Sequence, residues 1–262
     1  MSVDRDLLLE RDGHIAFITV NRPAARNSFT YEMYARMAAL CGELARADAV
    51  RVVIMRGAGD EAFIAGSDIG QFLDFRTAEQ ARAYEAHVER AIGAFEALPK
   101  PTIAILKGSV TGSGAAFATV ADLRLAAPNL RVGVPIARTL GNTLSMRNVA
   151  RMVDTLGVGT TKELLLTARL IDADECARHG LVHEIVPLDR LDARARELAE
   201  QLASLAPLTL RSTKLAVLRA LEARRAALGD GADLVALAYT SEDFREGVRA
   251  FLEKRAPRWS GR

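Results

Sequence analysis

Cysteine is scarce in this chain of 262 residues, and long apolar runs are missing from it. The two cysteines, Cys41 and Cys176, lie far apart in segments with helical patterning, so we expect free buried thiols in a reducing compartment rather than a disulfide. No segment approaches the roughly 18 consecutive apolar residues of a membrane-spanning helix. The first residues also lack the apolar core of a signal peptide. These absences predict a cytoplasmic protein.

Blocks of charge of one sign are missing as well. Lys and Arg (35) nearly balance Asp and Glu (33), and the formal net charge is only +2. The basic residues are spread along the chain, so we expect neither a nucleic-acid partner nor a membrane surface, although the arginine-rich C-terminal end could bind a phosphate. Half of the residues are hydrophobic, which is enough for a substantial core in a chain of this length.

Segments with strand and helix patterning alternate along the first two thirds of the chain. Residues 14–23 predict a strand, and residues 31–48 predict a helix capped by Ser28 or Thr30. Residues 50–59 are almost wholly apolar, as in a strand that is buried on both faces of a parallel sheet. Residues 77–98 predict a long amphipathic helix, which prolines then end. Further strands are expected within 102–108, 123–128 and 182–187.

The segments that follow Pro187 are predicted to be helical up to the end of "SEDFREGVRAFLEKRAPRW". Residues 201–262 contain too little apolar mass for an independent domain, so we expect them to pack on the core or on a neighbouring subunit. The alternation before them predicts an α/β core with right-handed crossovers.

Two glycine patterns match nucleotide-binding motifs only in part. Gly112-x-Gly114 could begin a dinucleotide-binding fingerprint, but Phe117 stands where the third glycine belongs, and no acidic residue follows at the expected distance. Residues 157–162, "GVGTTK", lack the Gly-Lys-Ser/Thr order of a phosphate-binding loop. The start of a helix explains this second pattern better.

Signals for an esterase or a metal site are also incomplete. Neither Ser109 nor Ser113 lies in a Gly-x-Ser-x-Gly sequence, so a nucleophile elbow is not supported. His179 and His183 are four residues apart, which on one helix could bind a metal. A glycine follows the first histidine and the second lies in a strand-like segment, so we expect the two side chains to diverge and no metal to bind.

Two turns that contain glycine and serine lie at loop-to-helix junctions. Residues 65–68 read Ala-Gly-Ser-Asp, and residues 112–114 read Gly-Ser-Gly. Capping of a helix by Asp68 would explain the first turn by itself. Taken together, however, the backbone N–H groups of Ser67 and Ser113 could converge on one oxygen, and a helix start favours negative charge there.

Five segments in order carry a resemblance to a known family. They are "NRPAARNSF" (21–29), "AFIAGSDI" (62–69), "LPKPTIAILKGSVTGSGAAFATVADLRLAA" (98–127), "TKELLLTARLIDADECARHGLVHEIVP" (161–187) and "SEDFREGVRAFLEKRAPRW" (241–259). On these segments the chain is identified as a member of the enoyl-CoA hydratase/isomerase (crotonase) superfamily over almost its whole length. The resemblance implies an α/β fold, a crotonase-like spiral of ββα units over residues 1–200. It also implies a helical C-terminal trimerisation region over 201–262, in a homotrimer or a hexamer built from two trimers.

The same resemblance implies an acyl-CoA thioester as substrate, with no cofactor besides the coenzyme A of that substrate. It assigns the backbone N–H groups of Ser67 and Ser113 to an oxyanion hole, which would stabilise an enolate more in the transition state than in the ground state. It assigns Phe251 and Lys254 to a coenzyme A that is often bound to an adjacent subunit. The full set of expected coenzyme A contacts is Arg22, Ala25, Arg26, Ala65, Gly66, Asp68, Ile69, Gly112, Phe251 and Lys254.

Two positions depart from the pattern of the family's hydratases. Those enzymes use two glutamates, and the matching positions here are Ala116 and Ile136. A positioned acid or base contributes about 10²- to 10⁴-fold to a rate. We therefore expect isomerase, decarboxylase or thioester hydrolase activity rather than standard hydration. A catalytically silent acyl-CoA-binding or assembly subunit and a weak enoyl-CoA hydratase remain the alternatives.

Several residues could replace the missing glutamates. The polar residues nearest the second position are Arg138, Thr139, Asn142 and Thr143. Asn142 could orient water or a substrate group, and Arg138 could pair with a substrate carboxylate. These residues could instead cap a helix and face a subunit contact. An acid such as Asp74 or Glu79 could also reach the site, whereas Asp122 is expected to be structural.

Overall fold

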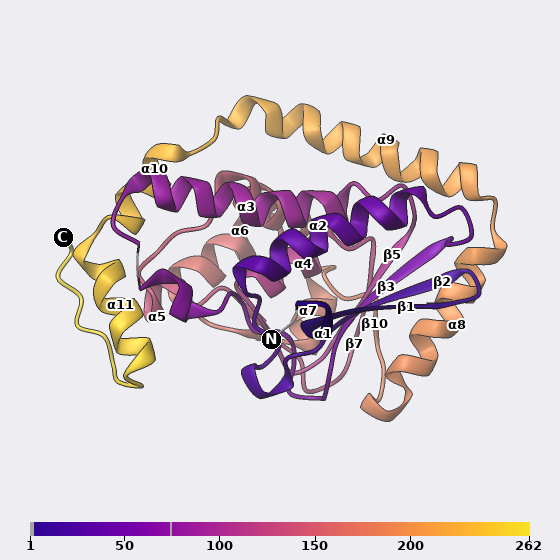
Figure 1. The fold of residues 1–262 in the computed structure, drawn as a ribbon, viewed down its shortest axis with the longest axis horizontal. Coiled ribbons are helices and arrows are strands. Elements are labelled where there is room, and N and C mark those ends of the chain that lie inside the picture. The colour runs from indigo at the N-terminus through magenta and orange to yellow at the C-terminus, as the bar shows by residue number, and fades with distance from the viewer. Residues whose placement is uncertain (1–2, 74) are drawn as a thin grey trace.

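The computed structural model describes residues 3–73 and 75–262, which form two β-sheets surrounded by helices (Figure 1). One sheet has six strands in the order β1-β2-β3-β5-β7-β10, and the other has four in the order β4-β6-β8-β9. The strands are β1 (Leu7–Asp12), β2 (Ile15–Val20), β3 (Val52–Gly57), β4 (Ala62–Ile64), β5 (Thr102–Leu106), β6 (Ser109–Thr111), β7 (Leu123–Ala126), β8 (Arg131–Gly133), β9 (Ile171–Asp172) and β10 (Glu184–Ile185). Strand pairs are parallel except β1–β2 and β8–β9.

The helices follow the alternation that the sequence predicts. They are α1 (Val3–Asp6), α2 (Tyr31–Arg46), α3 (Ala78–Glu96), α4 (Ser113–Val120), α5 (Ile136–Thr139), α6 (Met146–Thr167), α7 (Ala173–Arg178), α8 (Leu191–Ser204), α9 (Pro207–Arg225), α10 (Ala232–Tyr239) and α11 (Glu242–Leu252). Short 3₁₀ segments lie at Pro23–Ala25, Ile69–Phe72, Leu188–Arg190 and Ala226–Leu228. None of the helices in the described part of the chain is long and apolar enough to cross a membrane.

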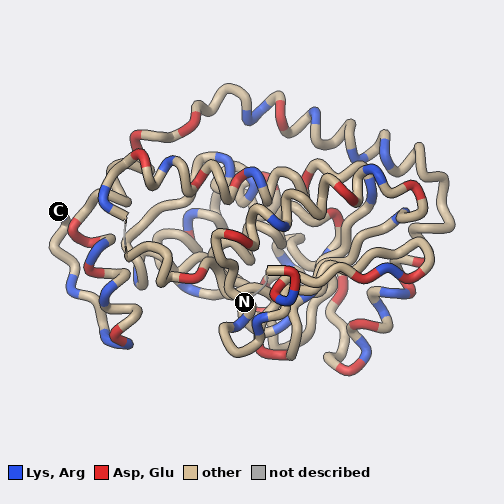
Figure 2. Tube along the Cα trace, in the orientation of Figure 1, with Lys and Arg blue, Asp and Glu red and all other residues tan. Residues whose placement is uncertain are grey.

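The larger sheet is covered on both faces, which explains why its central strands are mostly apolar. All residues of β2 and β5 are buried, and β3, for which the sequence predicts burial on both faces, is buried except at Arg56. Alternate residues of β2 belong to two different core clusters, one that includes α2 and α3 and one that includes α8. Figure 1 shows α2 and α3 on one side of these strands and α8 on the other. Figure 2 shows charges of both signs along α8 and α11, whereas β2 and β5 contain no charged residue.

The helix boundaries follow ordinary capping chemistry. Thr30, rather than Ser28, caps α2 by accepting a hydrogen bond from the N–H of Met33. Thr77 and Gln80 form a reciprocal capping box at the start of α3, which ends shortly before Pro99. Gly157 has φ 77° and ψ 163° and interrupts α6, so "GVGTTK" marks a break between two helical stretches.

Some predicted elements differ from the structure. Strand β1 is absent from the sequence prediction, although it pairs along its whole length with β2 across a turn at Gly13, whose φ is +57°. The predicted strand at 182–187 contributes only the two residues of β10. The helical prediction at the C-terminus is wrong beyond Leu252, because the remaining residues are turns and irregular chain. The division of the chain at residue 200 and the trimerisation role of residues 201–262 stay predictions.

Helix α9 is attached to the core by charged side chains. Its buried residues are Lys214 and Arg225. Arg225 pairs with Glu96 at 2.8 Å and with Asp154 at 2.9 Å. Lys214 donates to Asp122 Oδ2 at 2.7 Å, and Asp122 also accepts from the backbone N–H of Thr102. These bonds support the expected structural role of Asp122.

Candidate active site

The two glycine-serine turns lie against each other. Strands β4 and β6 are parallel neighbours, and each leads directly into one of the turns. The carboxyl ends of parallel strands meet at one edge of a sheet, which is where α/β proteins bind ligands. A Cβ atom on Gly112 would lie 3.3 Å from the Cα of Gly66, and both residues have positive φ, 56° and 101°. Glycine at these two positions allows the backbones to approach closely.

The hydrogen bonds that hold each turn leave the N–H groups of Ser67 and Ser113 without acceptors. Ser67 is bridged to Phe29 through its neighbours, because the Phe29 N–H donates to the Gly66 carbonyl and the Asp68 N–H donates to the Phe29 carbonyl. Ser113 is the first residue of α4, where an N–H has no intrahelical acceptor. Within the described part of the chain, neither N–H donates a hydrogen bond.

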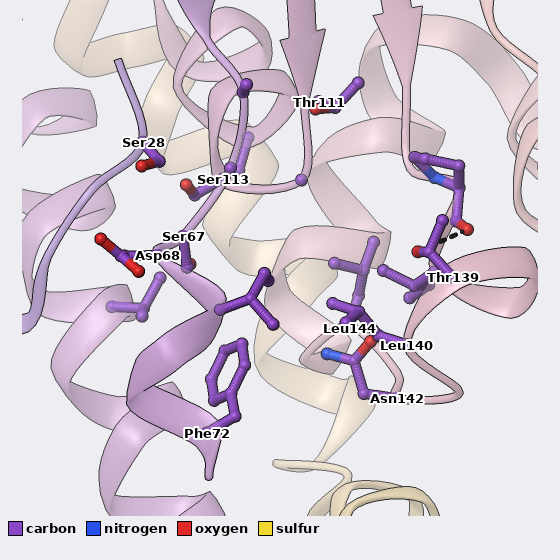
Figure 3. A pocket seen from close by; sticks show the side chains of 18 of the residues that line it. Ser28, Ser67, Asp68, Phe72, Thr111, Ser113, Thr139, Leu140, Asn142 and Leu144 are labelled. Atoms are coloured by element: carbon purple, nitrogen blue, oxygen red, sulfur yellow. Dashed lines mark hydrogen bonds between the residues drawn. The ribbon is translucent and has the colours of Figure 1, made fainter. Parts of the chain in front are cut away.

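A cavity of about 470 Å³ opens in front of these turns. Figure 3 shows Ser67 and Ser113 on one wall, with Thr139, Leu140, Asn142 and Leu144 on the facing wall. The residues that the sequence predicts for the site and that line this cavity are Ala25, Arg26, Ala65, Gly66, Ser67, Asp68, Ile69, Gly112, Ser113, Asn142 and Phe251. Ala116 and Ile136 line the same cavity, so aliphatic groups face it at the two positions that the resemblance assigns to hydratase glutamates.

Three other predicted site residues do not line the cavity. Arg138 and Lys254 are exposed to solvent. Arg22 lies behind the first turn, where it donates to the Ser28 carbonyl at 2.6 Å and to Asp68 Oδ2 at 3.0 Å. The position of Arg138 therefore does not support a role in pairing with a substrate carboxylate, whereas Arg22 positions the turn.

The suggested replacement acids gain no support from the structure. Glu79 is exposed, pairs with Arg82 at 2.8 Å and is not among the residues that line the cavity. Asp74 lies outside the described residues. His179 contacts Thr160, whereas His183 accepts from the backbone N–H of Arg124, so the two histidines diverge as expected.

The Ser67 hydroxyl is held by two buried tyrosines. Its oxygen lies 2.7 Å from the Tyr34 hydroxyl and accepts from the Tyr84 hydroxyl at 2.5 Å. Burial raises the pKa of Tyr34 to about 12 and that of Tyr84 well above its ordinary value. Both phenols therefore stay neutral at physiological pH. They fix the side chain of Ser67 while its backbone N–H remains available.

The site also contains a carboxyl group that the sequence analysis missed. Glu85, on α3, lines the cavity, and its Oε1 accepts from the Tyr239 hydroxyl at 2.6 Å. The Tyr239 hydroxyl in turn accepts from Asn142 Nδ2 at 3.1 Å. Burial, together with repulsion from Glu89, raises the pKa of Glu85 to about 7, against the effect of the Tyr239 hydrogen bond.

A sequence signal for Glu85 did exist. The buried positions of α3 include Ala81, Val88 and Ile92. Glu85 lies four residues after Ala81 and three before Val88, on the same face of the helix as these apolar residues. A carboxyl group at an apolar position of an amphipathic helix is the kind of exception that points to a site.

The remaining titratable and metal-binding side chains do not form a second reactive site among the described residues. In the described residues, no three His, Cys, Asp or Glu side chains lie together as a metal ion would require. Cys41 and Cys176 are buried free thiols, and burial raises the pKa of each to about 12, so both remain protonated.

Comparison with known proteins identifies the family. The family model for enoyl-CoA hydratase/isomerase matches residues 10–262. The chain belongs to the enoyl-CoA hydratase/isomerase family. Membership places it among enzymes that act on acyl-CoA thioesters, and it confirms the resemblance seen in the five sequence segments.

Relatives of this family match almost the whole chain. The chain is 33% identical over 251 residues to the short-chain-enoyl-CoA hydratase of Clostridium acetobutylicum, covering 95% of each chain. It is 30% identical to the (E)-benzylidenesuccinyl-CoA hydratase of Thauera aromatica, covering 97% of this chain and 98% of that one. A crystal structure of an enoyl-CoA hydratase/carnithine racemase from Magnetospirillum magneticum superposes with a TM-score of 0.79 at 32% identity, covering 98% of this chain and 96% of that one. The crotonase fold is thus confirmed.

Proposed function

We propose that this family member binds an acyl-CoA in the 470 Å³ cavity with the thioester oxygen between the N–H groups of Ser67 and Ser113. The support is geometric, because both N–H groups lack acceptors in the described residues and lie on turns whose glycines touch. Such donors stabilise the negative oxygen of an enolate more than the neutral carbonyl of the substrate. Loss of one donor costs about 3 kcal/mol in known oxyanion holes.

The proposed reaction uses this oxyanion hole for chemistry other than standard hydration. One observation carries this proposal: Ala116 and Ile136, at the two glutamate positions of the family's hydratases, both line the cavity. Methyl and butyl side chains can neither activate water nor protonate carbon. Isomerisation, decarboxylation or thioester hydrolysis is therefore favoured, although the relatives compared above are named hydratases.

Coenzyme A would enter along the first turn. Arg26, Gly66 and Ile69 line the cavity, and Asp68 is held in place by Arg22. Phe251 lines the cavity although half of its surface is exposed, and Lys254 is exposed nearby in sequence. We propose that these two residues complete a coenzyme A site in a trimer or hexamer.

Turnover of a panel of enoyl-, malonyl- and aroyl-CoA esters tests the proposal. We expect product from at least one 3-enoyl, malonyl or aroyl ester, with crotonyl-CoA hydrated at least about 100-fold more slowly than by a hydratase with both glutamates. Hydration of crotonyl-CoA at ordinary hydratase rates would exclude the non-hydratase assignment. Binding of the esters in calorimetry without any turnover would instead favour a silent acyl-CoA-binding subunit.

A further inference from the structure

Two carboxylates line the proposed acyl cavity among the described residues, Asp68 and Glu85. Asp68 is occupied by the turn, since it pairs with Arg22 at 3.0 Å and caps the N–H of Gly70. Glu85 forms no ion pair with any described Lys, Arg or His side chain. It is therefore the carboxyl group of this cavity that remains free for chemistry.

We propose that Glu85 removes the α-proton of the bound acyl thioester and returns it to carbon, an assignment that rests on the proposed acyl-CoA function. Glu85 belongs to α3. This helix contains neither of the glycine turns, and it does not contain Ala116 or Ile136, the two positions matched to hydratase glutamates. The cavity therefore has a potential acid–base group that comes from a different element than the two aliphatic replacements, Ala116 and Ile136.

A hydrogen-bond chain holds the Glu85 carboxyl group in place. Asn142 donates to the Tyr239 hydroxyl, which donates to Glu85 Oε1, and all three residues line the cavity. The Oδ1 atom of Asn142 is buried and has no hydrogen-bond partner among the described residues. A buried polar atom without a partner is costly, so it suggests that a substrate group or water belongs beside it. Tyr239 and Asn142 are positioning residues in this proposal.

Glu85 also lies between the acyl cavity and a second cavity. That cavity, of about 480 Å³, is lined among others by Arg82, Glu89, Arg147 and Asp230. Of the described residues, Glu85 is the one that lines both cavities. A proton on its carboxyl group can thus exchange with solvent from the second cavity while an acyl group fills the first.

The surroundings of Glu85 suit a proton carrier near neutral pH. The titratable groups around Glu85 come from several elements. They are Tyr34 on α2, Tyr84 and Glu89 on α3 and Tyr239 on α10, with Arg82, Arg147, Arg225 and Asp230 around the second cavity. Those arginines are engaged by other acids, Arg82 by Glu79, Arg147 by Glu89 and Glu222, and Arg225 by Glu96 and Asp154. Burial of Glu85 raises its pKa to about 7, where a group can both accept and donate a proton.

The proposed step balances without a further reactant. Ionised Glu85 takes the α-proton, and the electron pair of the broken C–H bond forms the enolate, whose negative oxygen lies between the Ser67 and Ser113 N–H groups. Protonated Glu85 then delivers the proton to the α-carbon, or to the γ-carbon of a 3-enoyl chain. The second outcome shifts the double bond into conjugation, so a single carboxyl group is sufficient for isomerisation.

The test follows trans-3-hexenoyl-CoA in D₂O with the full-length protein, by mass spectrometry and NMR. We expect the wild type to form the 2-enoyl isomer and to incorporate deuterium. Glu85→Gln, which keeps the size of the side chain, should lose about 10²- to 10⁴-fold in both rates. The matched control is Glu79→Gln on the same helix, which changes an exposed residue outside the cavity and should stay within about twofold. Calorimetry with the same ester checks that each variant still binds.

A second variant separates a chemical role from a structural one. Tyr239→Phe removes a donor to the Glu85 carboxylate, so the pKa seen in the pH profile of kcat/KM should rise relative to the wild type. A Glu85→Gln variant that binds the ester and isomerises it within about threefold of wild type overturns the assignment. A wild type that binds the ester but exchanges no α-proton overturns it too, while acyl-CoA binding stands. Absence of binding by the wild type would defeat the proposed function itself.

Discussion

At the scale of single residues, the role of the Ser113 backbone N–H can be tested separately from the role of its side chain. Its hydroxyl is buried and has no hydrogen-bond partner among the described residues, whereas its N–H lies at the first position of α4. Proline is tolerated at that position of a helix, where it removes the N–H together with the serine hydroxyl.

We therefore predict that Ser113→Pro lowers kcat by about 10²- to 10³-fold, as expected for loss of one oxyanion donor. Ser113→Ala keeps the N–H and should lose far less activity. Steady-state rates on whichever ester of the panel is turned over, with thermal melting to check folding, distinguish the two variants. Equal losses would show that the hydroxyl, and not the backbone, acts on the substrate.

Glu85 makes stability depend on pH. Because its pKa of about 7 in the folded protein is raised above that of an exposed glutamate, the folded state holds its proton more tightly than the unfolded state. Stability is thus lost as the pH rises from about 4.5 through 7, by about 3 kcal/mol for a shift of this size.

Glu85→Gln should remove this dependence, because glutamine does not titrate. We predict that the variant is more stable than the wild type at pH 8, and that the difference shrinks by about 2–3 kcal/mol at pH 5. Urea unfolding at the two pH values measures it. A difference that stays the same at both pH values would show that Glu85 does not titrate in this range.

At the scale of elements, burial decides what can be predicted from the sequence. Strands β2, β3 and β5 are buried on both faces apart from Arg56 of β3, so their sequences are mostly apolar runs. Strand β1 is only partly buried and ends in Glu-Arg-Asp, and β4, β6, β8 and β9 have three residues or fewer. Such short or polar segments show no hydrophobic periodicity. Their stability comes from pairing with strands that are distant in the sequence.

The same limit applies to the site. The glycine turns could be predicted because the positive φ of Gly66 and Gly112 requires a specific residue type. A role for Glu85 could not be assigned, because its partner Tyr239 lies 154 residues away on α10. Its place on the apolar face of α3 distinguishes it from the exposed Glu79, but that place does not reveal which group it meets.

Helix α9 offers an element-scale prediction, since it is anchored by Arg225 between Glu96 and Asp154. Arg225→Ala would leave Asp154, whose side chain is 9% exposed, without its closest partner. We predict a loss of about 3 kcal/mol in the free energy of unfolding. Arg219→Ala, an exposed position on the same helix, should change it by less than about 0.5 kcal/mol. Urea unfolding of both variants tests this, and equal effects would contradict the anchor.

At the scale of the whole molecule, the cavity is open where the C-terminal region passes it. Phe251 lines the cavity but is 50% exposed, and Lys254, with φ of 53°, follows the end of α11 in solvent. In one chain, Lys254 therefore lies outside the site to which family resemblance assigns it. An adjacent subunit would resolve this difference, because Lys254 of one chain could then reach the coenzyme A of another.

We predict that Lys254→Ala weakens binding of coenzyme A about three- to fivefold, the effect of about 0.6–1 kcal/mol that an exposed ion pair contributes. The loss should shrink at high salt, which screens exposed charges. Lys162→Ala, an exposed lysine on α6 that does not line the cavity, serves as the control. Calorimetry with coenzyme A at two salt concentrations, together with sedimentation of the protein, tests the idea. If the protein is a monomer and the variant binds coenzyme A more weakly, Lys254 contacts the ligand of its own chain. Unchanged affinity in a trimer would remove Lys254 from the site.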